Sequence, residues 1–464
     1  MPWSGAFSSI WPSTSSNVTD YTATTLPLQR LAGGVDVHSY RRLRQLIWLY
    51  ALLLFFEGAL RKWFLPGLAA PLLVVRDPVA VLILFTTAVS RYHVLNPYTL
   101  VTFGYTAIAF LLTLAVGHQN LYVDIYGARI TVLHFPLIFV IGQAFTRDDV
   151  LRFGRFMLWI ALPMVLLIGL QYFSPQSAWV NRGVGGDVEG AGFSGAMGFF
   201  RPPATFSFTN GTTLFFNMLA AFVAYFWIGK REEAPRLLLI AGSVAVILAI
   251  PLTLSRGYLF QLVITVVFLL GASATSGRSL ARMGIALVAL PPVVMILSAL
   301  PFFQTSLEVL QRRFEVAAVS EGGLEGTLIT RFLGGMFGAV GGAGELPLWG
   351  EGLGIGTNVG SALLRGSRGG FITGEGEWQR VIGELGPILG LLAVFVRLAL
   401  GVHIALRAVR ELFRDNALPL MITSFGFLQV TYANWAQPTS MGFAIVTGGL
   451  AIAAMNRSPT PEVS

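Results

Sequence analysis

The chain has 464 residues, of which 54% are hydrophobic and only 12% are charged, and its mean hydropathy is +0.69. This composition is too apolar for an ordinary soluble protein and excludes a soluble enzyme. The formal charge is +8 and there is no cysteine. Disulfides and thiolate metal sites are therefore excluded, and we expect the basic excess to set membrane topology rather than to bind nucleic acid.

The first 45 residues are rich in Ser, Thr and Pro, and basic residues gather just before the first apolar run. No small-residue cleavage site follows a short apolar stretch, so we expect no removable signal peptide. We interpret 1–45 as a cytoplasmic tail. The first span, 46–65, contains Glu57, Arg61 and Lys62, and the spacing of Glu57 and Arg61 predicts a helical ion pair.

Twelve apolar runs follow one another along the chain, and a spanning helix needs roughly 20 apolar residues. The runs fall near 46–65, 72–90, 98–117, 130–145, 157–173, 212–228, 237–254, 258–274, 283–300, 382–400, 417–433 and 440–455. The expected fold class is all-α, a polytopic membrane bundle of about 12 transmembrane helices with a large structured extracytoplasmic loop. Its parts are nine helices within 46–300, an outer loop at 174–211, the large loop at 301–380, three helices within 381–455 and a cytoplasmic tail at 456–464.

The positions of Lys and Arg predict the orientation, because short cytoplasmic loops carry them in excess. With the N-terminus inside, seventeen basic residues lie on the inner side: Arg30, Arg41, Arg42, Arg44, Arg91, Arg147, Arg152, Arg155, Lys230, Arg231, Arg236, Arg278, Arg282, Arg407, Arg410, Arg414 and Arg457. The short outer loops hold six: Arg61, Lys62, Arg129, Arg182, Arg201 and Arg256. Both termini are therefore predicted to be cytoplasmic.

Two arginines stand out on the predicted outer face. Arg256 occupies the three-residue turn 255–257 between two spans, and Arg201 precedes a proline-fixed, aromatic segment that ends at Asn210. Taken alone, Arg256 is explained as an anchor at the lipid headgroups and Arg201 as a solvated loop charge. Together they are suited to a rigid cationic pocket, and guanidinium groups bind phosphate in bidentate fashion.

A close pair of acids, Glu375 and Glu377, lies at the outer mouth of the tenth span, next to Arg380. Either carboxylate is suited to act as a general base for a hydroxyl nucleophile. Each is also explained as a helix-capping acid, which the helix dipole favours. Further into the span, Glu384 is expected to be structural or gated by a partner.

In this order, these elements resemble the O-antigen ligase and polymerase-like superfamily of bacterial polytopic glycosyltransferases. Four segments carry the resemblance: RPPATFSFTN at 201–210, LSRG at 254–257, PLWGEGLGIGTN at 347–358 and EGEWQRVIGELG at 375–386. It extends from roughly 130 to 400. In the last segment the chain departs from the family, because Glu-Gly opens it where the family commonly has His-Asn.

The resemblance implies transfer or polymerisation of a glycan from a polyprenyl diphosphate carrier on the outer face of the bacterial cytoplasmic membrane. The reaction would invert the anomeric carbon and use no metal, nucleotide sugar or other cofactor. The implied partners are the polyprenyl diphosphate-linked donor, a glycan or lipid acceptor and the lipid bilayer, and other polysaccharide assembly proteins are further candidates.

The resemblance also implies roles for particular residues. Arg201 and Arg256 match the family's diphosphate-binding arginines. The base is assigned from the residues themselves, as either Glu375 or Glu377, because the family's His-Asn pair is missing here. Further residues expected in the substrate loop are Arg331, Arg380 and Asn210.

Twelve helices with both termini inside also fit a transporter or a flippase of lipid-linked glycans. Transporters usually place their polar site near the midplane, on broken helices related by internal repeats. Here the charges crowd one face and no repeat is convincing, which favours interfacial chemistry. A third interpretation, a non-catalytic scaffold for polysaccharide export, predicts that Arg201, Arg256 and Glu377 can each be replaced without loss of glycan product.

Overall fold

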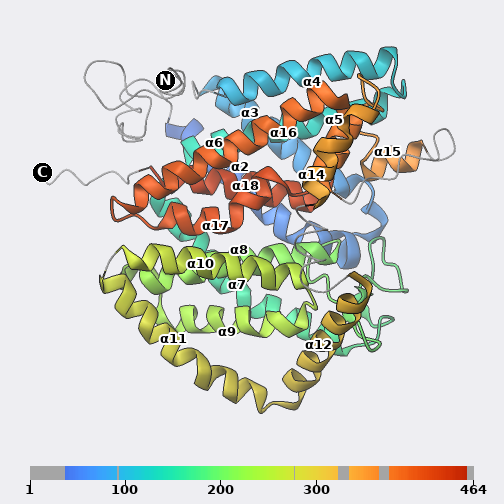
Figure 1. Ribbon diagram of the computed structural model, residues 1–464. Helices are drawn as coiled ribbons and strands as arrows, with labels where there is room; N and C mark the ends of the chain where they lie inside the picture. The colour runs from blue at the N-terminus through green and yellow to red at the C-terminus, as the bar shows by residue number, and fades with distance from the viewer. Residues whose placement is uncertain (1–36, 91–93, 276, 322–333, 365–375, 457–464) are drawn as a thin grey trace, which may run out of the picture.

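The computed structural model describes residues 37–90, 94–275, 277–321, 334–364 and 376–456. Within them the chain forms a bundle whose long helices lie roughly side by side (Figure 1). The α-helices are α2 (Val37–Ala59), α3 (Arg76–Val89), α4 (Pro97–Ala115), α5 (Leu121–Arg129), α6 (Leu137–Ala144), α7 (Arg147–Phe173), α8 (Thr209–Ile228), α9 (Arg236–Leu252), α10 (Arg256–Ala274), α11 (Gly277–Ser298), α12 (Pro301–Glu321), α14 (Gly334–Gly341), α15 (Asn358–Leu363), α16 (Glu377–Leu412), α17 (Leu418–Thr431) and α18 (Pro438–Ala453).

Short 3-10 and π-helical segments connect or extend these helices: η1 (Leu60–Phe64), η2 (Pro66–Leu68), η3 (Pro71–Val74), η4 (Ile130–His134), η5 (Trp179–Asn181), η6 (Arg231–Glu233) and η8 (Gly342–Glu345). In the part of the chain that the structure describes, the only sheet is an antiparallel pair, β1 (Phe193–Ser194) with β2 (Phe200–Arg201).

Eight helical segments in the described residues are long and apolar enough to cross a membrane. They are formed by α2 with η1, η3 with α3, α4, α5 through α6, α7, α8, α10 and α16. Three further apolar helices, α9, α17 and α18, are shorter. The predicted fold class is therefore confirmed as an all-α membrane helix bundle.

Two helices extend beyond their predicted apolar runs, because charged residues interrupt the hydropathy without interrupting the helix. The run at 130–145 is the second part of the continuous segment Leu121–Ala144, in which Arg129 is neutralised by Asp77 at 2.6 Å. The run at 382–400 is the middle of α16, which continues through further basic residues. Ion pairs inside the bundle thus let charged residues enter spanning helices.

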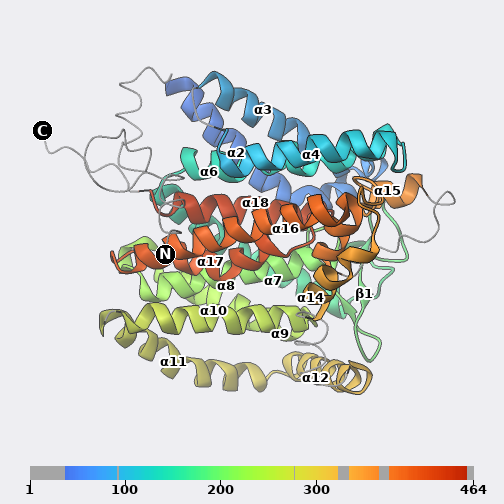
Figure 2. The same cartoon turned by 45° about the horizontal axis from the view of Figure 1, so that its top comes forward.

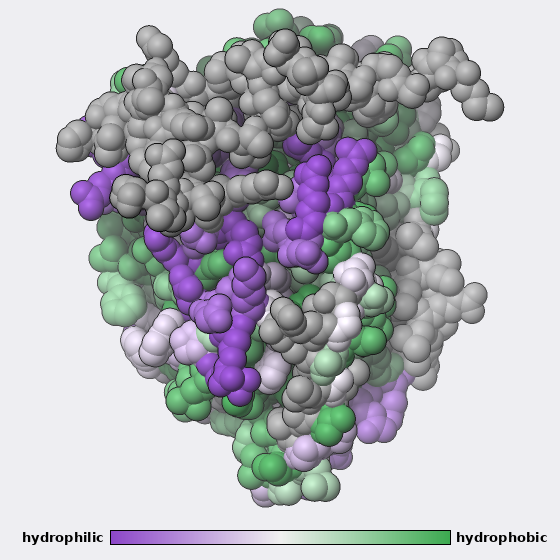
Figure 3. Space-filling view, turned by 90° about the vertical axis from the view of Figure 1, so that its left-hand side faces the viewer, coloured by the Kyte–Doolittle hydropathy of each residue, from purple (hydrophilic) through white to green (hydrophobic). Residues whose placement is uncertain are grey.

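The helix ends define two opposite faces of the bundle. At one end, the first residue of α7, Arg147, donates from its backbone N–H to the Asn456 carbonyl oxygen (3.3 Å) and pairs with Glu233 (2.6 Å). In the same region, Arg44 of α2 pairs with Asp149 of α7. We call this end the basic face; hydrophilic side chains gather on it (Figure 3). The segments that meet here are all predicted to share one side of the membrane.

The opposite end, which we call the loop face, carries the connection 174–208 together with α12, α14 and α15 (Figure 1, Figure 2). Of the predicted large loop at 301–380, the described residues form α12, α14, η8, α15 and the start of α16, which begins at Glu377. The described parts of the two predicted outer segments therefore lie at the same end of the bundle.

Candidate functional site

The segment 201–210 lies directly against the end of the first helix. Gly58 makes this contact possible, because a Cβ at that position would lie only 2.2 Å from the backbone nitrogen of Ser207. Lys62 is buried and donates from Nζ to the Ala204 carbonyl oxygen at 2.5 Å. Arg61 donates from Nη1 to the Ser207 hydroxyl at 2.9 Å. The basic residues at the end of the first span therefore fix the position of this segment.

Backbone strain collects in the segments that hold the two predicted arginines. In the described residues, five non-glycine residues have positive φ, and three of them, Met197 (51°), Ala204 (51°) and Leu254 (47°), lie in these segments. Leu254 comes two residues before Arg256 and is fully buried. Such strain persists only where the surrounding structure holds it, and it is frequent at functional sites.

Three arginines gather at the loop face. Arg201 pairs in β2 with Phe193 of β1, Arg256 is the first residue of α10, and Arg313 belongs to α12. Burial, together with the nearby charges of Arg313 and Arg256, lowers the pKa of Arg201 to about 10. The Nε atom of Arg201 is buried and has no hydrogen-bond partner among the described residues. Because these like charges repel one another, the arrangement is suited to a multiply charged anion.

Sequence reasoning found two members of this cluster and missed the third. Arg313 follows Arg312 on an amphipathic helix, where a charge run usually marks a solvated face. Arg312 fits that description, since it is exposed and pairs with Glu315 at 2.9 Å. Arg313 is half-buried instead. Arg312 and Arg313 differ in the direction in which their side chains leave α12, and no motif in the sequence gives that direction.

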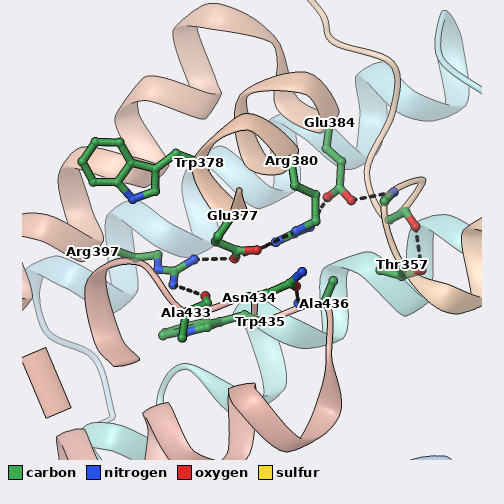
Figure 4. A network of polar contacts seen from close by, with 12 residues as sticks. Thr357, Glu377, Trp378, Arg380, Glu384, Arg397, Ala433, Asn434, Trp435 and Ala436 are labelled. Carbon is green, nitrogen blue, oxygen red and sulfur yellow. Dashed lines mark hydrogen bonds and ion pairs between the residues drawn. The ribbon is translucent and has the colours of Figure 1, made fainter. Parts of the chain in front are cut away.

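A second polar cluster lies at the start of α16 (Figure 4). Glu377 is buried, and its carboxylate accepts hydrogen bonds from Arg380 (2.8 and 2.9 Å) and Arg397 (2.5 Å). Arg380 also donates to Glu384 at 2.7 Å, and the Arg397 guanidinium lies 4.1 Å from the ring centre of Trp435. Both carboxylate oxygens of Glu377 are engaged by guanidinium groups. This geometry favours an anchoring role for Glu377 over the predicted role of a base.

The glycine-rich segment 347–358 packs on α16 where that helix breaks. Gly386 and Gly350 have φ values of 78° and 72°, and a Cβ on Gly350 would lie 2.3 Å from the backbone nitrogen of Gly386. The Gly356 N–H donates to the Glu384 carboxylate at 2.8 Å. Two of the segments that carry the family resemblance therefore form one packed unit.

The remaining predicted site residues are placed as follows. Asn210 faces α18, where its Nδ2 atom donates to Gln437 Oε1 at 2.6 Å and to Ser440 Oγ at 3.0 Å. It thus ties the start of α8 to the start of α18. Glu375 and Arg331 lie outside the described residues.

No group of three His, Asp or Glu side chains within the described ranges is placed to hold a metal ion. No protein-family model matches the chain, and no curated protein matches it. The arginine cluster at the loop face is therefore the feature from which we infer a function.

Proposed function

We propose that this protein is a membrane glycosyltransferase that moves or polymerises a glycan from a polyprenyl diphosphate carrier. The observation that carries the proposal is the gathering of Arg201, Arg256 and Arg313 at the loop face. As a sugar leaves its diphosphate, negative charge develops on the diphosphate. Fixed guanidinium groups in a water-poor site stabilise that charge where it grows. In this proposal arginines supply the stabilisation without a metal or other cofactor.

The proposed reaction is a single displacement. The acceptor hydroxyl attacks the anomeric carbon from the side opposite the diphosphate, and the new C–O bond forms as the bond to the diphosphate oxygen breaks. The diphosphate leaves with the electron pair, and the hydroxyl proton passes to a carboxylate base. Inversion follows from this geometry. We retain Glu375 as the proposed base, because Glu377 is held by Arg380 and Arg397.

The local backbone supports the same assignment. Arg256 opens α10, so the amide groups and dipole of that helix add positive potential beside its guanidinium. The adjoining segment 201–210 is fixed by Lys62 and Arg61. A preorganised site of this kind does not have to rearrange as charge develops.

The proposal includes a membrane topology. Eight long helices, three shorter apolar helices and α11 make up the twelve expected spans. The segments 174–211 and 301–380 are extracytoplasmic, and both termini are on the cytoplasmic side of a bacterial cytoplasmic membrane. The arginine cluster then faces the outer leaflet, where the sugar groups of a lipid-linked glycan would be exposed.

A reconstituted assay tests the proposed function. The full-length protein is placed in liposomes with a polyprenyl diphosphate oligosaccharide and candidate acceptors, and new glycosidic bonds are measured by mass spectrometry. We expect Arg201→Gln and Arg256→Gln each to lower turnover by about 100-fold or more, as removal of a transition-state donor does. The matched control, Arg312→Gln, removes an exposed arginine from the same face and is expected to keep normal turnover.

Two outcomes would overturn the proposal. Undiminished turnover in both cluster variants would remove the arginines from the reaction. Movement of the donor between leaflets without any new glycosidic bond would instead identify a flippase.

A further inference from the structure

A hollow opens on the basic face, at the end of the bundle opposite the arginine cluster. Its volume is about 580 Å³, and it is lined by Arg155, Arg231, Glu232, Ala234, Pro235 and Arg236. The three arginines come from three elements, α7, η6 and α9. Their convergence is a property of the fold, because Arg155 is far from the other two in the sequence.

The hollow keeps an excess of positive charge. Arg155 donates from Nη1 to the Glu233 carbonyl oxygen at 3.2 Å, which holds its guanidinium at the rim. The Glu233 carboxylate is occupied by Arg147 (2.6 Å) and by the Tyr225 hydroxyl (2.7 Å). Glu232 is the only acid in the lining, so three arginines minus one glutamate leave a charge of +2.

The helix surfaces next to the hollow are apolar and exposed. On α7, Trp159 lies one turn beyond Arg155 and is 68% exposed, and Leu166 continues the same surface at 67%. On α9, Leu237 is 82% exposed and follows directly after Arg236. Exposed tryptophan beside arginine is typical of the depth of lipid headgroups. The cationic hollow therefore continues into an exposed apolar surface.

We propose that this hollow binds the headgroup of an anionic glycerophospholipid from the adjoining leaflet. Its phosphate would contact Arg155, Arg231 and Arg236, since guanidinium groups match phosphate geometry. Its acyl chains would lie along Trp159 and Leu237. Basic pockets between spanning helices are suited to such headgroups. The inference does not depend on the proposed transferase activity.

Lipid retention tests the proposal directly. The purified full-length protein is titrated with cardiolipin, phosphatidylglycerol or phosphatidylcholine, and bound lipid is counted by native mass spectrometry. We expect Arg155→Gln/Arg236→Gln to bind the anionic lipids about 30-fold more weakly, since each basic residue at a membrane surface contributes about fivefold. The control, Arg410→Gln/Arg414→Gln, removes the same charge from exposed positions on α16 and the turn after it, and is expected to bind like the unaltered protein.

A further variant distinguishes binding of a lipid from binding of a free anion. Trp159→Ala is expected to weaken lipid binding and to leave binding of inorganic phosphate unchanged. If the double variant fails to fold, Arg236→Gln alone gives the same test with a loss of about fivefold. Three outcomes would each overturn the proposal. The hollow variants could bind the anionic lipids as tightly as the unaltered protein does, or the unaltered protein could bind phosphatidylcholine as tightly as the anionic lipids. In the third, inorganic phosphate displaces the lipid to the same extent whatever acyl chains the lipid carries.

Discussion

Arg201 holds a charge that the folded chain disfavours. Burial and the charges of Arg313 and Arg256 lower its pKa from 12.5 to about 10. Because the folded pKa is the lower one, the charged side chain destabilises the fold below pH 10, and this penalty disappears as the pH rises from 10 to 12.5. We therefore expect Arg201→Gln to raise the Tm at pH 7 by about 1–3 °C while it lowers turnover by about 100-fold or more.

Thermal unfolding in detergent at pH 7 and pH 9 measures this effect, and the rise in Tm should be similar at both values because both lie below pH 10. Arg312→Gln, which removes an exposed arginine, is expected to leave the Tm unchanged. A lower Tm for Arg201→Gln would show that Arg201 stabilises the fold. The inference that its buried charge destabilises the folded protein would then be wrong.

Arg313 is predicted to belong to the same site. We expect Arg313→Gln to lower the affinity for a diphosphate donor about tenfold, because it removes one guanidinium from the cluster. Arg313→Lys keeps the charge and loses the bidentate geometry, so its affinity for the donor should lie between that of the unaltered protein and that of Arg313→Gln. Donor titration of the reconstituted protein measures both. If Arg313→Gln and Arg312→Gln behave alike, Arg313 lies outside the site.

Residue identities could be predicted from the sequence only where a turn or a proline limited the backbone. Arg256 sits in a turn with no spare residues, and Arg201 precedes a fixed segment, so both were identifiable. Arg313 depends on the direction of a side chain on α12. The anchoring of Glu377 depends on Arg397, which lies 20 residues further along α16. Neither contact has a local sequence signal.

The contact between the first helix and the segment 201–210 gives a test at the level of elements. A Cβ on Gly58 would lie 2.2 Å from Ser207 backbone, whereas a Cβ on Gly104 of α4 meets nothing within 4 Å. We expect Gly58→Ala to destabilise the protein by about 1–3 kcal/mol through overpacking. Gly104→Ala should be neutral or stabilising by about 0.5–1 kcal/mol, because alanine is the better helix former.

Denaturation of the two glycine variants in the same detergent measures the difference. Turnover should fall with stability only for Gly58→Ala, because only this variant displaces the segment that follows Arg201. Equal stability of the two variants would contradict the close packing of that segment on α2.

Hydropathy predicted which segments are helical better than it predicted the residues at which the helices begin and end. The span at 130–145 begins nine residues earlier in the structure, since Asp77 neutralises Arg129 inside the bundle. The break in α16 at Gly386 was not predicted either. It exists because the segment 347–358 crosses the helix there, and this contact joins parts of the chain that are distant in sequence.

At the level of the whole molecule, the absence of cysteine makes the proposed topology testable by single-cysteine labelling. Glu189→Cys introduces a thiol at an exposed position on the loop face, and Arg414→Cys introduces one between α16 and α17. We expect a membrane-impermeant maleimide to label Glu189→Cys in intact spheroplasts. Arg414→Cys should react only after permeabilisation. The reverse pattern would place the arginine cluster on the cytoplasmic side.

The distribution of Lys and Arg predicted which segments share a face, and the pairs Arg147–Glu233 and Arg44–Asp149 join segments of the predicted inner side. Charge counting concerns the orientation of loops, which neighbouring helices do not rearrange, and that orientation stays a prediction. The meeting of Arg201, Arg256 and Arg313 is a different kind of fact. It depends on where the folded chain places residues from β2, α10 and α12, and so it required the structure.

The most direct test of the arginine cluster compares polyprenyl diphosphate with polyprenyl monophosphate as ligands of the full-length protein in identical nanodiscs. We predict that the diphosphate binds at least about tenfold more tightly, and that Arg201→Gln or Arg313→Gln removes this preference while Arg312→Gln preserves it. Equal affinity for the two lipids, or a preference that survives in both cluster variants, would contradict the assignment of these guanidinium groups to a pyrophosphoryl group.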